Sequence, residues 1–310
     1  MPSLRARPIV EGALLAALAA LLGLASFYTG FGWPLAIPVL LAARRHGARS
    51  AALVTVVASG LLVLWLGPLA GLAAFGFLVA NGLTGGWALR RGWGAAACVG
   101  LMALAFLAVT AAGMGAADLL WHSNFWGQAW RSFANEVTTH AALFAPAGVT
   151  PQQLLSAVRT LLPVAAIVMA VGQAAGVYLL AAGVMGRLGE GLPAVPPFAQ
   201  WRLPPWATWA ALAALGLALL AHERGDKVLA STSGNLLLAA ACGYSVIAVA
   251  LGYGWLRGRG LSRRRASVLL ACAVGVVGLT QWLVLPLAGF LASQFQLRPG
   301  PAPGGRGEVP

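Results

Sequence analysis

The sequence predicts an all-α membrane protein, a bundle of about eight or nine helices that cross a lipid bilayer. Hydrophobic residues make up 60% of the 310 residues and charged residues only 9%, whereas a typical soluble domain carries about 25% charged residues. Long apolar runs recur along the chain, and arginines gather in the stretches between them. So few charges cannot cover a surface that faces water, so the chain must face lipid.

A helix needs roughly 20 apolar residues to cross the hydrocarbon core of a bilayer. Nine candidate segments are found, at 9–28, 33–43, 51–66, 69–89, 95–117, 161–186, 206–222, 234–256 and 266–294. The second contains Pro34 and Pro38 and reaches only about 17 Å as a helix, so it is a tilted, broken or partial span. The ninth contains Pro286, which leaves open whether it is one helix or two.

The basic residues predict the orientation of these segments. With the N-terminus in the cytoplasm, most of the 20 basic residues fall in cytoplasmic loops, at Arg5, Arg7, Arg44, Arg45, Arg49, Arg90, Arg91, Arg187, Arg202, Arg257, Arg259, Arg263, Arg264 and Arg265. This bias is typical of the positive-inside rule, and it favours counting 33–43 as a crossing. Anionic lipid headgroups, rather than nucleic acid, are the expected partners of the formal charge of +13.

The connections divide the chain into regions. Residues 1–187 form a six-helix bundle with a long outer connection at 118–160, residues 188–205 a Pro-rich cytoplasmic linker, residues 206–295 the C-terminal membrane helices, and residues 296–310 a disordered tail.

The outer connection contains two further signals. Trp126, Trp130, Phe133 and Val137 share one helical face, which predicts an amphipathic helix lying in the interface or covering an outward-facing cavity. Downstream, Thr150-Pro151-Gln152-Gln153 matches a capping box, with proline at the first helical position. We expect a helix that starts at this point to continue into the sixth span.

Uncharged polar residues lie inside the predicted spans. They include Asn81 and Thr84 in the fourth span, Gln173 and Tyr178 in the sixth and Asn235 in the eighth. Such groups are costly in lipid and usually face the bundle interior or a cavity. They either hydrogen-bond a small neutral ligand, together with Trp126 and Trp130, or tie helices together. Because no charged residue lies mid-membrane, ion-coupled transport is disfavoured.

Small residues spaced four apart let membrane helices approach closely. The first span contains two overlapping pairs, Ala13 with Ala17 and Ala16 with Ala20, and the sixth contains Gly172 with Gly176. Packing within the chain and an interface with a partner protein both fit these pairs.

Reactive constellations are not found in the sequence. The three cysteines, Cys98, Cys242 and Cys272, lie in apolar runs without CxxC pairing, and the four histidines lack ligand spacing. We therefore expect no metal, no cofactor and no enzymatic activity.

The order of features resembles the YybS-like family of bacterial membrane proteins, which has no assigned biochemical activity. Glu11 to Leu18, Pro34 to Pro38 and Leu40 to Arg45 carry the early part of the likeness, and Phe198, Trp201 and Pro204 its most specific part. Asn235, Tyr244, Gly252 and Arg259 to Ser262 carry the late part.

That family is distantly similar to the substrate-binding (S) subunits of energy-coupling-factor vitamin transporters, in which an AxxxA in the first helix docks on a coupling subunit. The resemblance implies that the first six spans form an S-like bundle in the bacterial cytoplasmic membrane. Ala13 and Ala17, or Ala16 and Ala20, would then contact the coupling subunit.

Three functional hypotheses follow. The first is a small-molecule binding or transport component, with its ligand between the outer halves of the helices. The alternative is a non-catalytic scaffold or regulatory protein that assembles with other membrane proteins. An intramembrane enzyme that acts on lipid is the third, and it has no acid, base or metal cluster to support it.

Overall fold

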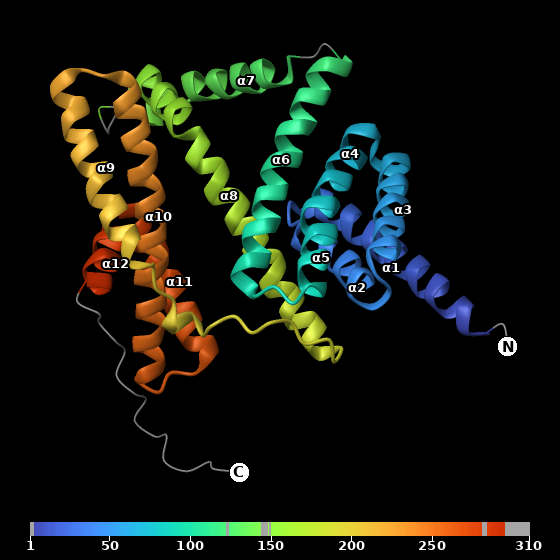
Figure 1. The fold of residues 1–310 in the computed structure, drawn as a ribbon. Helices are drawn as coiled ribbons and strands as arrows, with labels where there is room; N and C mark the ends of the chain where they lie inside the picture. Colours follow the sequence, from blue (N-terminus) through green and yellow to red (C-terminus); the bar gives the residue numbers. More distant parts are fainter. Residues whose placement is uncertain (1–2, 122–123, 144–147, 149, 281–283, 295–310) are drawn as a thin grey trace. The chain divides into compact units, whose positions relative to one another are not determined.

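The structure, a computed structural model, describes residues 3–121, 124–143, 148, 150–280 and 284–294 (Figure 1). Within these ranges the chain is built from helices and their connections, with no strand. The all-α fold class is therefore confirmed. The chain divides into two compact units: unit 1 contains residues 1–155 and 166–194, and unit 2 contains residues 156–165 and 195–310.

Among the residues that the structure describes, seven helices are long and apolar enough to cross a membrane. They are Ile9–Thr29, Ala48–Leu66, Pro68–Arg90, Ala95–Ala116, Pro151–Arg187, Pro205–Arg224 and Lys227–Gly258. Each coincides with one of the predicted segments, which confirms a multi-pass membrane protein that sits in a lipid bilayer. The two remaining predicted segments, 33–43 and 266–294, have a different form.

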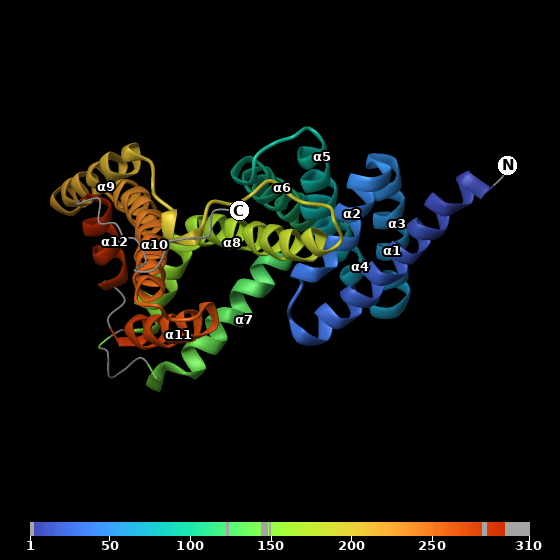
Figure 2. The same ribbon diagram turned by 90° about the horizontal axis from the view of Figure 1, so that it is seen from below.

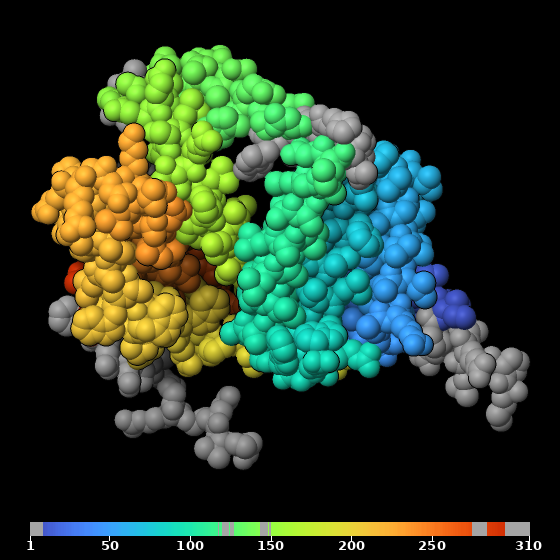
Figure 3. Space-filling view, turned by 45° about the horizontal axis from the view of Figure 1, so that its top comes forward, coloured from blue at the N-terminus to red at the C-terminus, as the bar shows by residue number. Residues whose placement is uncertain are grey.

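Unit 1 is built around a short helix. Its elements are α1 (Ser3–Thr29), α2 (Ile37–His46), α3 (Ala48–Leu66), α4 (Pro68–Phe77), α5 (Thr84–Arg90), α6 (Ala95–Trp121), α7 (Phe125–Thr139) and parts of α8 (Pro151–Arg187). Helix α2 packs against α1, α3 and α5 (Figures 1 and 2). The outer faces of α3, α4 and α6 form a continuous surface (Figure 3).

The segment predicted to cross at 33–43 is a four-residue 3₁₀ turn, η1 (Trp33–Ala36), followed by the ten residues of α2. Every residue from Ile37 to Ala43 is buried, so α2 faces protein rather than lipid. Arg45, in its last turn, contacts Glu11 near the start of α1. The two helices are therefore antiparallel, and the chain returns to the side on which α1 begins.

Unit 2 contains η5 (Phe198–Gln200), α9 (Pro205–Arg224), α10 (Lys227–Gly258), α11 (Arg263–Thr280) and α12 (Val284–Gln294). The described part of the ninth predicted segment comprises two elements, α11 and α12, on either side of residues 281–283, and Pro286 lies in α12. Helix α12 packs closely on α10: a side chain at Gly289 would meet the carbonyl of Tyr244, with its carbon at 2.6 Å.

Helix α8 begins as the sequence predicts. Thr150 Oγ1 accepts a hydrogen bond from the Gln153 backbone N–H at 3.3 Å, and Gln153 Oε1 accepts one from the Thr150 N–H at 2.9 Å. The capping box is confirmed, and the helix runs on into the sixth span.

Inside α8, Pro163 interrupts the backbone hydrogen-bond ladder. Asn235 of α10 bonds α8 on both sides of this proline: its Nδ2 donates to Thr160 O at 2.8 Å, and its Oδ1 accepts from Val164 N at 3.3 Å. Pro163 lacks the N–H that would bond to the carbonyl of Arg159, and the Asn235 amide bonds the two polar groups of the next rung, so Asn235 ties two helices together within unit 2.

Candidate functional site

The centre of unit 1 is a close seam between α2 and the polypeptide that follows α4. This polypeptide is the π-helical segment η2 (Leu78–Leu83) together with α5. An added Cβ at Gly82 would lie 2.6 Å from Val39 Cγ1, and one at Gly86 would collide with the Cβ of Ala43. Two glycines four apart therefore face two α2 residues four apart, the geometry by which small residues bring membrane helices together.

Asn81 lies within this π-helical segment and is 0% exposed. Its Nδ2 donates to Phe77 O at 3.2 Å, but its Oδ1 has no hydrogen-bond partner among the described residues. Thr84, one turn later, donates to the carbonyl of Ala80 in its own helix. Of these two predicted ligand residues, Asn81 has an unused acceptor within the bundle.

Helix α3, which packs against η2, contributes two more buried polar groups. Thr55 donates to Ala51 O at 2.9 Å, within its own helix. The Ser59 hydroxyl is buried and has no partner in the part of the chain that the structure describes. A buried polar group without a hydrogen-bond partner lowers the stability of a protein by about 1–3 kcal/mol. The interior of unit 1 contains two such groups, on Asn81 and Ser59, which is unusual for a folded protein.

Gln173 and Tyr178, the other predicted ligand residues on α8, both have partners in unit 1. Trp33 Nε1 donates to Gln173 Oε1 at 3.0 Å, and the Tyr178 hydroxyl donates to Pro193 O at 2.8 Å. Gly176 lies under the Trp33 ring, where an added Cβ would be 2.6 Å from Cε2, whereas Gly172 faces open space. In this GxxxG pair, one glycine accommodates an indole.

We expect Gln173→Leu to lower the stability of the protein by about 1–2 kcal/mol, because the Trp33 indole N–H loses its acceptor. In a Trp33→Phe background, which lacks that N–H, the same substitution should cost little. Thermal unfolding of the four proteins measures the coupling between the two side chains. An equal cost in both backgrounds would contradict the role of the hydrogen bond.

The predicted amphipathic helix in the outer connection is confirmed as α7, with Val137 buried on its inner side. Trp130 is half-buried and lies beside Phe133, with ring centroids 5.8 Å apart. The Trp126 side chain lies outside the described residues. Among the described residues, the ring contact of Trp130 is therefore within its own helix, and no hydrogen bond joins it to Asn81 or Gln173.

The two alanine pairs of α1 lie on different faces. Ala16 and Ala20 are buried in unit 1, whereas Ala13 and Ala17 are exposed. The buried pair serves packing within the chain, and the exposed pair belongs to the outer face of α1 with Leu14 and Leu18.

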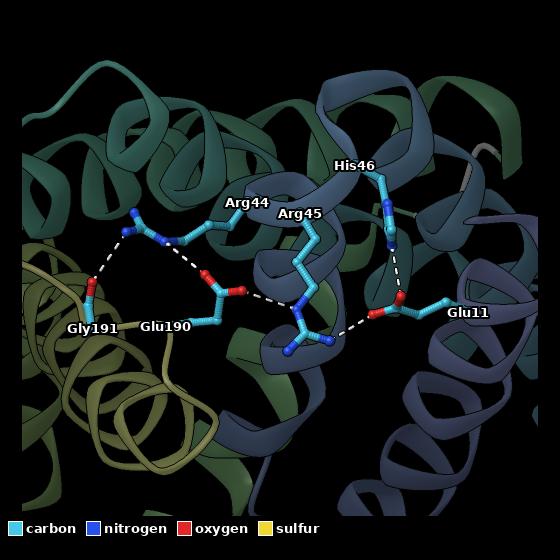
Figure 4. A network of polar contacts seen from close by, with 6 residues as sticks. All are labelled: Glu11, Arg44, Arg45, His46, Glu190 and Gly191. Atoms are coloured by element: carbon cyan, nitrogen blue, oxygen red, sulfur yellow. Dashed lines mark hydrogen bonds and ion pairs between the residues drawn. The ribbon is translucent and has the colours of Figure 1, made fainter. Parts of the chain in front are cut away.

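An ion-pair cluster closes the end of unit 1 where α1 begins (Figure 4). Arg45 Nη1 lies 2.6 Å from Glu11 Oε1, and its Nε lies 3.1 Å from Glu190 Oε1. Arg44 Nε lies 3.5 Å from the other oxygen of Glu190. Hydrogen bonds to Glu11 and then to Glu190 raise the pKa of Arg45, so this side chain remains a cation.

Two further contacts extend the cluster. His46 Nε2 lies 3.1 Å from Glu11 Oε2, an ion pair when the imidazole is protonated, and Arg44 Nη2 donates to Gly191 O at 3.1 Å. Together with the bond from Tyr178 to Pro193, the cluster fixes the polypeptide after α8 against α2. Each of these side chains keeps up to about one third of its surface exposed to solvent. Because solvent screens the charges, each single ion pair contributes little to stability.

The sequence analysis missed several residues of this region, among them Trp33, Ser59 and Glu190. The Gly82–Gly86 seam had a signal, because its spacing is the same as that of Gly172 and Gly176. Glu190 had another, as one of only 7 acidic residues in a strongly basic chain. No sequence signal singled out Trp33 or Ser59. The hydrogen-bond partner of Trp33 is distant in sequence, and Ser59 has no partner among the described residues.

Among the residues that the structure describes, no group of three or more His, Cys, Asp or Glu side chains could hold a metal ion. The three cysteines are free thiols.

Comparison with curated proteins and with solved structures gives no match. A family model described as "Predicted membrane protein (DUF2232)" matches residues 12–239, from within α1 into α10. The match covers more than half of the chain, and the chain therefore belongs to the DUF2232 family of predicted membrane proteins.

Proposed function

We propose that the chain binds a small neutral molecule within the membrane, in unit 1, and takes part in its transport. The observation that carries the proposal is the Asn81 side chain, which is fully buried in a π-helical segment with its carbonyl oxygen unpaired. Interruptions of this kind in α-helices occur frequently at functional sites. The sequence resemblance described above, which runs through the YybS-like family to substrate-binding subunits, implies the same function.

The chemistry of the surroundings favours a neutral ligand. Near η2 the buried polar side chains of α3 are hydroxyls, Thr55 and Ser59, which carry no charge. An unpaired amide oxygen can accept a hydrogen bond from a hydroxyl or an N–H group, and an unpaired serine hydroxyl can donate one. A ligand with both donors and acceptors would satisfy the two groups that the protein leaves unpaired.

The test is ligand-induced thermal stabilisation of the purified protein, with vitamins and related metabolites, with and without an energy-coupling module. We expect Asn81→Leu to abolish the stabilisation by an active compound. Without ligand, the stability of the variant should stay within about 1 kcal/mol of the parent, because leucine removes the unpaired buried oxygen but also the hydrogen bond from Nδ2 to Phe77 O.

Thr55→Val is the matched control, since Thr55 is equally buried but bonds within its own helix. It should retain the ligand response. The absence of stabilisation by any compound of a broad panel, or an unchanged response in Asn81→Leu, would contradict the proposal.

A scaffold or regulatory protein is the second candidate, and the exposed pair Ala13 and Ala17 favours it. Small exposed residues four apart would let a helix of another membrane protein approach α1 closely. Cross-linking from this face in native membranes should recover a distinct partner protein. Recovery of no partner other than further copies of the chain would count heavily against this role.

A further inference from the structure

Unit 2 contains a cavity of about 720 Å³ where the linker after α8 meets the start of α9. Its walls come from four parts of unit 2: the linker, α9, α10 and the end of α12. The polar and aromatic residues that line it are Trp201, Arg202, Thr208, Trp209, Ser293 and Gln294.

The linker wall of the cavity is fixed in place by aromatic contacts. The Phe198 ring lies 5.2 Å from the Trp201 ring and 6.0 Å from that of Tyr253 on α10. Trp201 Nε1 donates to Pro196 O at 2.9 Å, and the Leu203 side chain packs over Gly243. The cavity is thus bounded by an ordered segment, because its non-helical wall is held by side chains on both sides.

Two residues that line the cavity, Thr208 and Gln294, belong to a chain of hydrogen bonds across three helices. Gln294 Nε2 donates to Thr208 Oγ1 at 2.8 Å, and Thr208 Oγ1 lies 3.1 Å from the Tyr244 hydroxyl. The Gln294 amide has two N–H groups, and Ser293, whose hydroxyl can donate, also lines the cavity. Neutral donors are therefore available beside the charged one.

Arg202 provides the charge. Its side chain is exposed at the cavity, and it forms no ion pair within the described residues. No carboxylate is among the residues that line the cavity. A guanidinium with five N–H donors, with hydroxyl and amide donors near it and no acid, is suited to a phosphate group.

Tryptophans indicate the depth of the cavity in the membrane. Trp206 and Trp209, in the first turns of α9, are 69% and 72% exposed. Exposed tryptophans at the end of an apolar helix are typical of the headgroup level of a bilayer. A phosphate bound by Arg202 would lie at the level of lipid phosphates, and the apolar surface of α9 beyond it would face acyl chains.

We propose that this cavity binds the phosphate of an anionic phospholipid, with Arg202 as its charged contact. The site lies entirely in unit 2 and does not depend on the ligand proposed for unit 1.

The experiment uses the full-length chain, freed of lipid in a neutral detergent and titrated with phosphatidylglycerol, phosphatidylcholine or inorganic phosphate. Binding is followed by native mass spectrometry and by the shift of the thermal unfolding midpoint. Phosphatidylglycerol should bind and raise the midpoint more than phosphatidylcholine. Arg202→Gln should weaken phosphatidylglycerol binding roughly tenfold or more, because a charge-assisted hydrogen bond is lost, and Arg202→Lys should retain part of the affinity.

Arg224→Gln is the matched control, since Arg224 is an exposed arginine of unit 2, at the other end of α9, that does not line this cavity. It should bind phosphatidylglycerol as the parent protein does. An equal loss in both glutamine variants, or none in Arg202→Gln, overturns the site. Arg202-dependent binding of inorganic phosphate without binding of phosphatidylglycerol assigns the cavity to a soluble phosphate and overturns the lipid as its ligand.

Discussion

Replacing Gly86 by leucine is expected to separate α2 from α5 and to destabilise unit 1 by about 3 kcal/mol or more. An added Cβ at Gly86 already collides with the Cβ of Ala43, and the carbonyl oxygen of Leu40 lies only 3.9 Å away. Alanine has no rotamer to change, so only movement of the α2 or α5 backbone can relieve the collision. Since α2 is buried from Ile37 to Ala43, movement of this helix disturbs its contacts with α1 and α3 as well.

The same displacement should reach the ion-pair cluster, because Arg44 and Arg45 follow Ala43 directly. Gly60→Leu is the matched control: Gly60 lies in α3, is exposed, and has no atom within 4 Å of an added Cβ. Thermal unfolding in detergent, followed by size-exclusion chromatography, compares the two variants. A loss in Gly60→Leu as large as that in Gly86→Leu would show that bulk, rather than the seam, causes the effect.

Helix positions could be predicted because lipid imposes a length and a composition on each span. Seven predicted segments coincide with long apolar helices, and the capping box at Thr150 fixes the start of α8. The short second segment could not be assigned in the same way. Its residues are as apolar as those of a lipid-facing helix, although the structure buries them among other helices.

The sequence could not predict which small residues are buried and which are exposed, because both faces of a membrane helix are apolar. Ala16 and Ala20 are buried and Ala13 and Ala17 are exposed, yet the two pairs have the same spacing and composition. The predicted Gly172 faces open space. Gly82 and Gly86 form the seam instead, because α2 approaches them from a position that spacing alone does not encode.

The hydrogen-bond partners of the intramembrane amides could not be predicted from the sequence either. The amides stand out because polar residues are rare in such spans, but Gln173 meets a tryptophan 140 residues away and Asn235 meets a carbonyl 75 residues away. Each of these bonds depends on tertiary packing. The sequence therefore identified where polar groups lie, while the structure assigns Gln173 and Asn235 to helix contacts and leaves an unpaired oxygen at Asn81.

Replacing Asn235 by leucine is expected to lower the stability of unit 2 by about 2–4 kcal/mol. The amide accepts from Val164 N at 3.3 Å and donates to Thr160 O at 2.8 Å. Leucine has the same approximate size but can do neither, so a backbone N–H and a backbone carbonyl lose their partners. Inside a membrane no water can replace these bonds.

Pro163 makes the bridge necessary, and this gives the prediction its control. In a Pro163→Ala background the helix can restore its regular ladder, so Val164 N can donate to Thr160 O directly. Asn235→Leu should then cost clearly less than it does with Pro163 present. Thermal unfolding of the four proteins measures the difference. An equal cost in both backgrounds would mean that Asn235 stabilises α10 by packing alone, whereas a reduced cost would establish that its amide completes the interrupted backbone of α8.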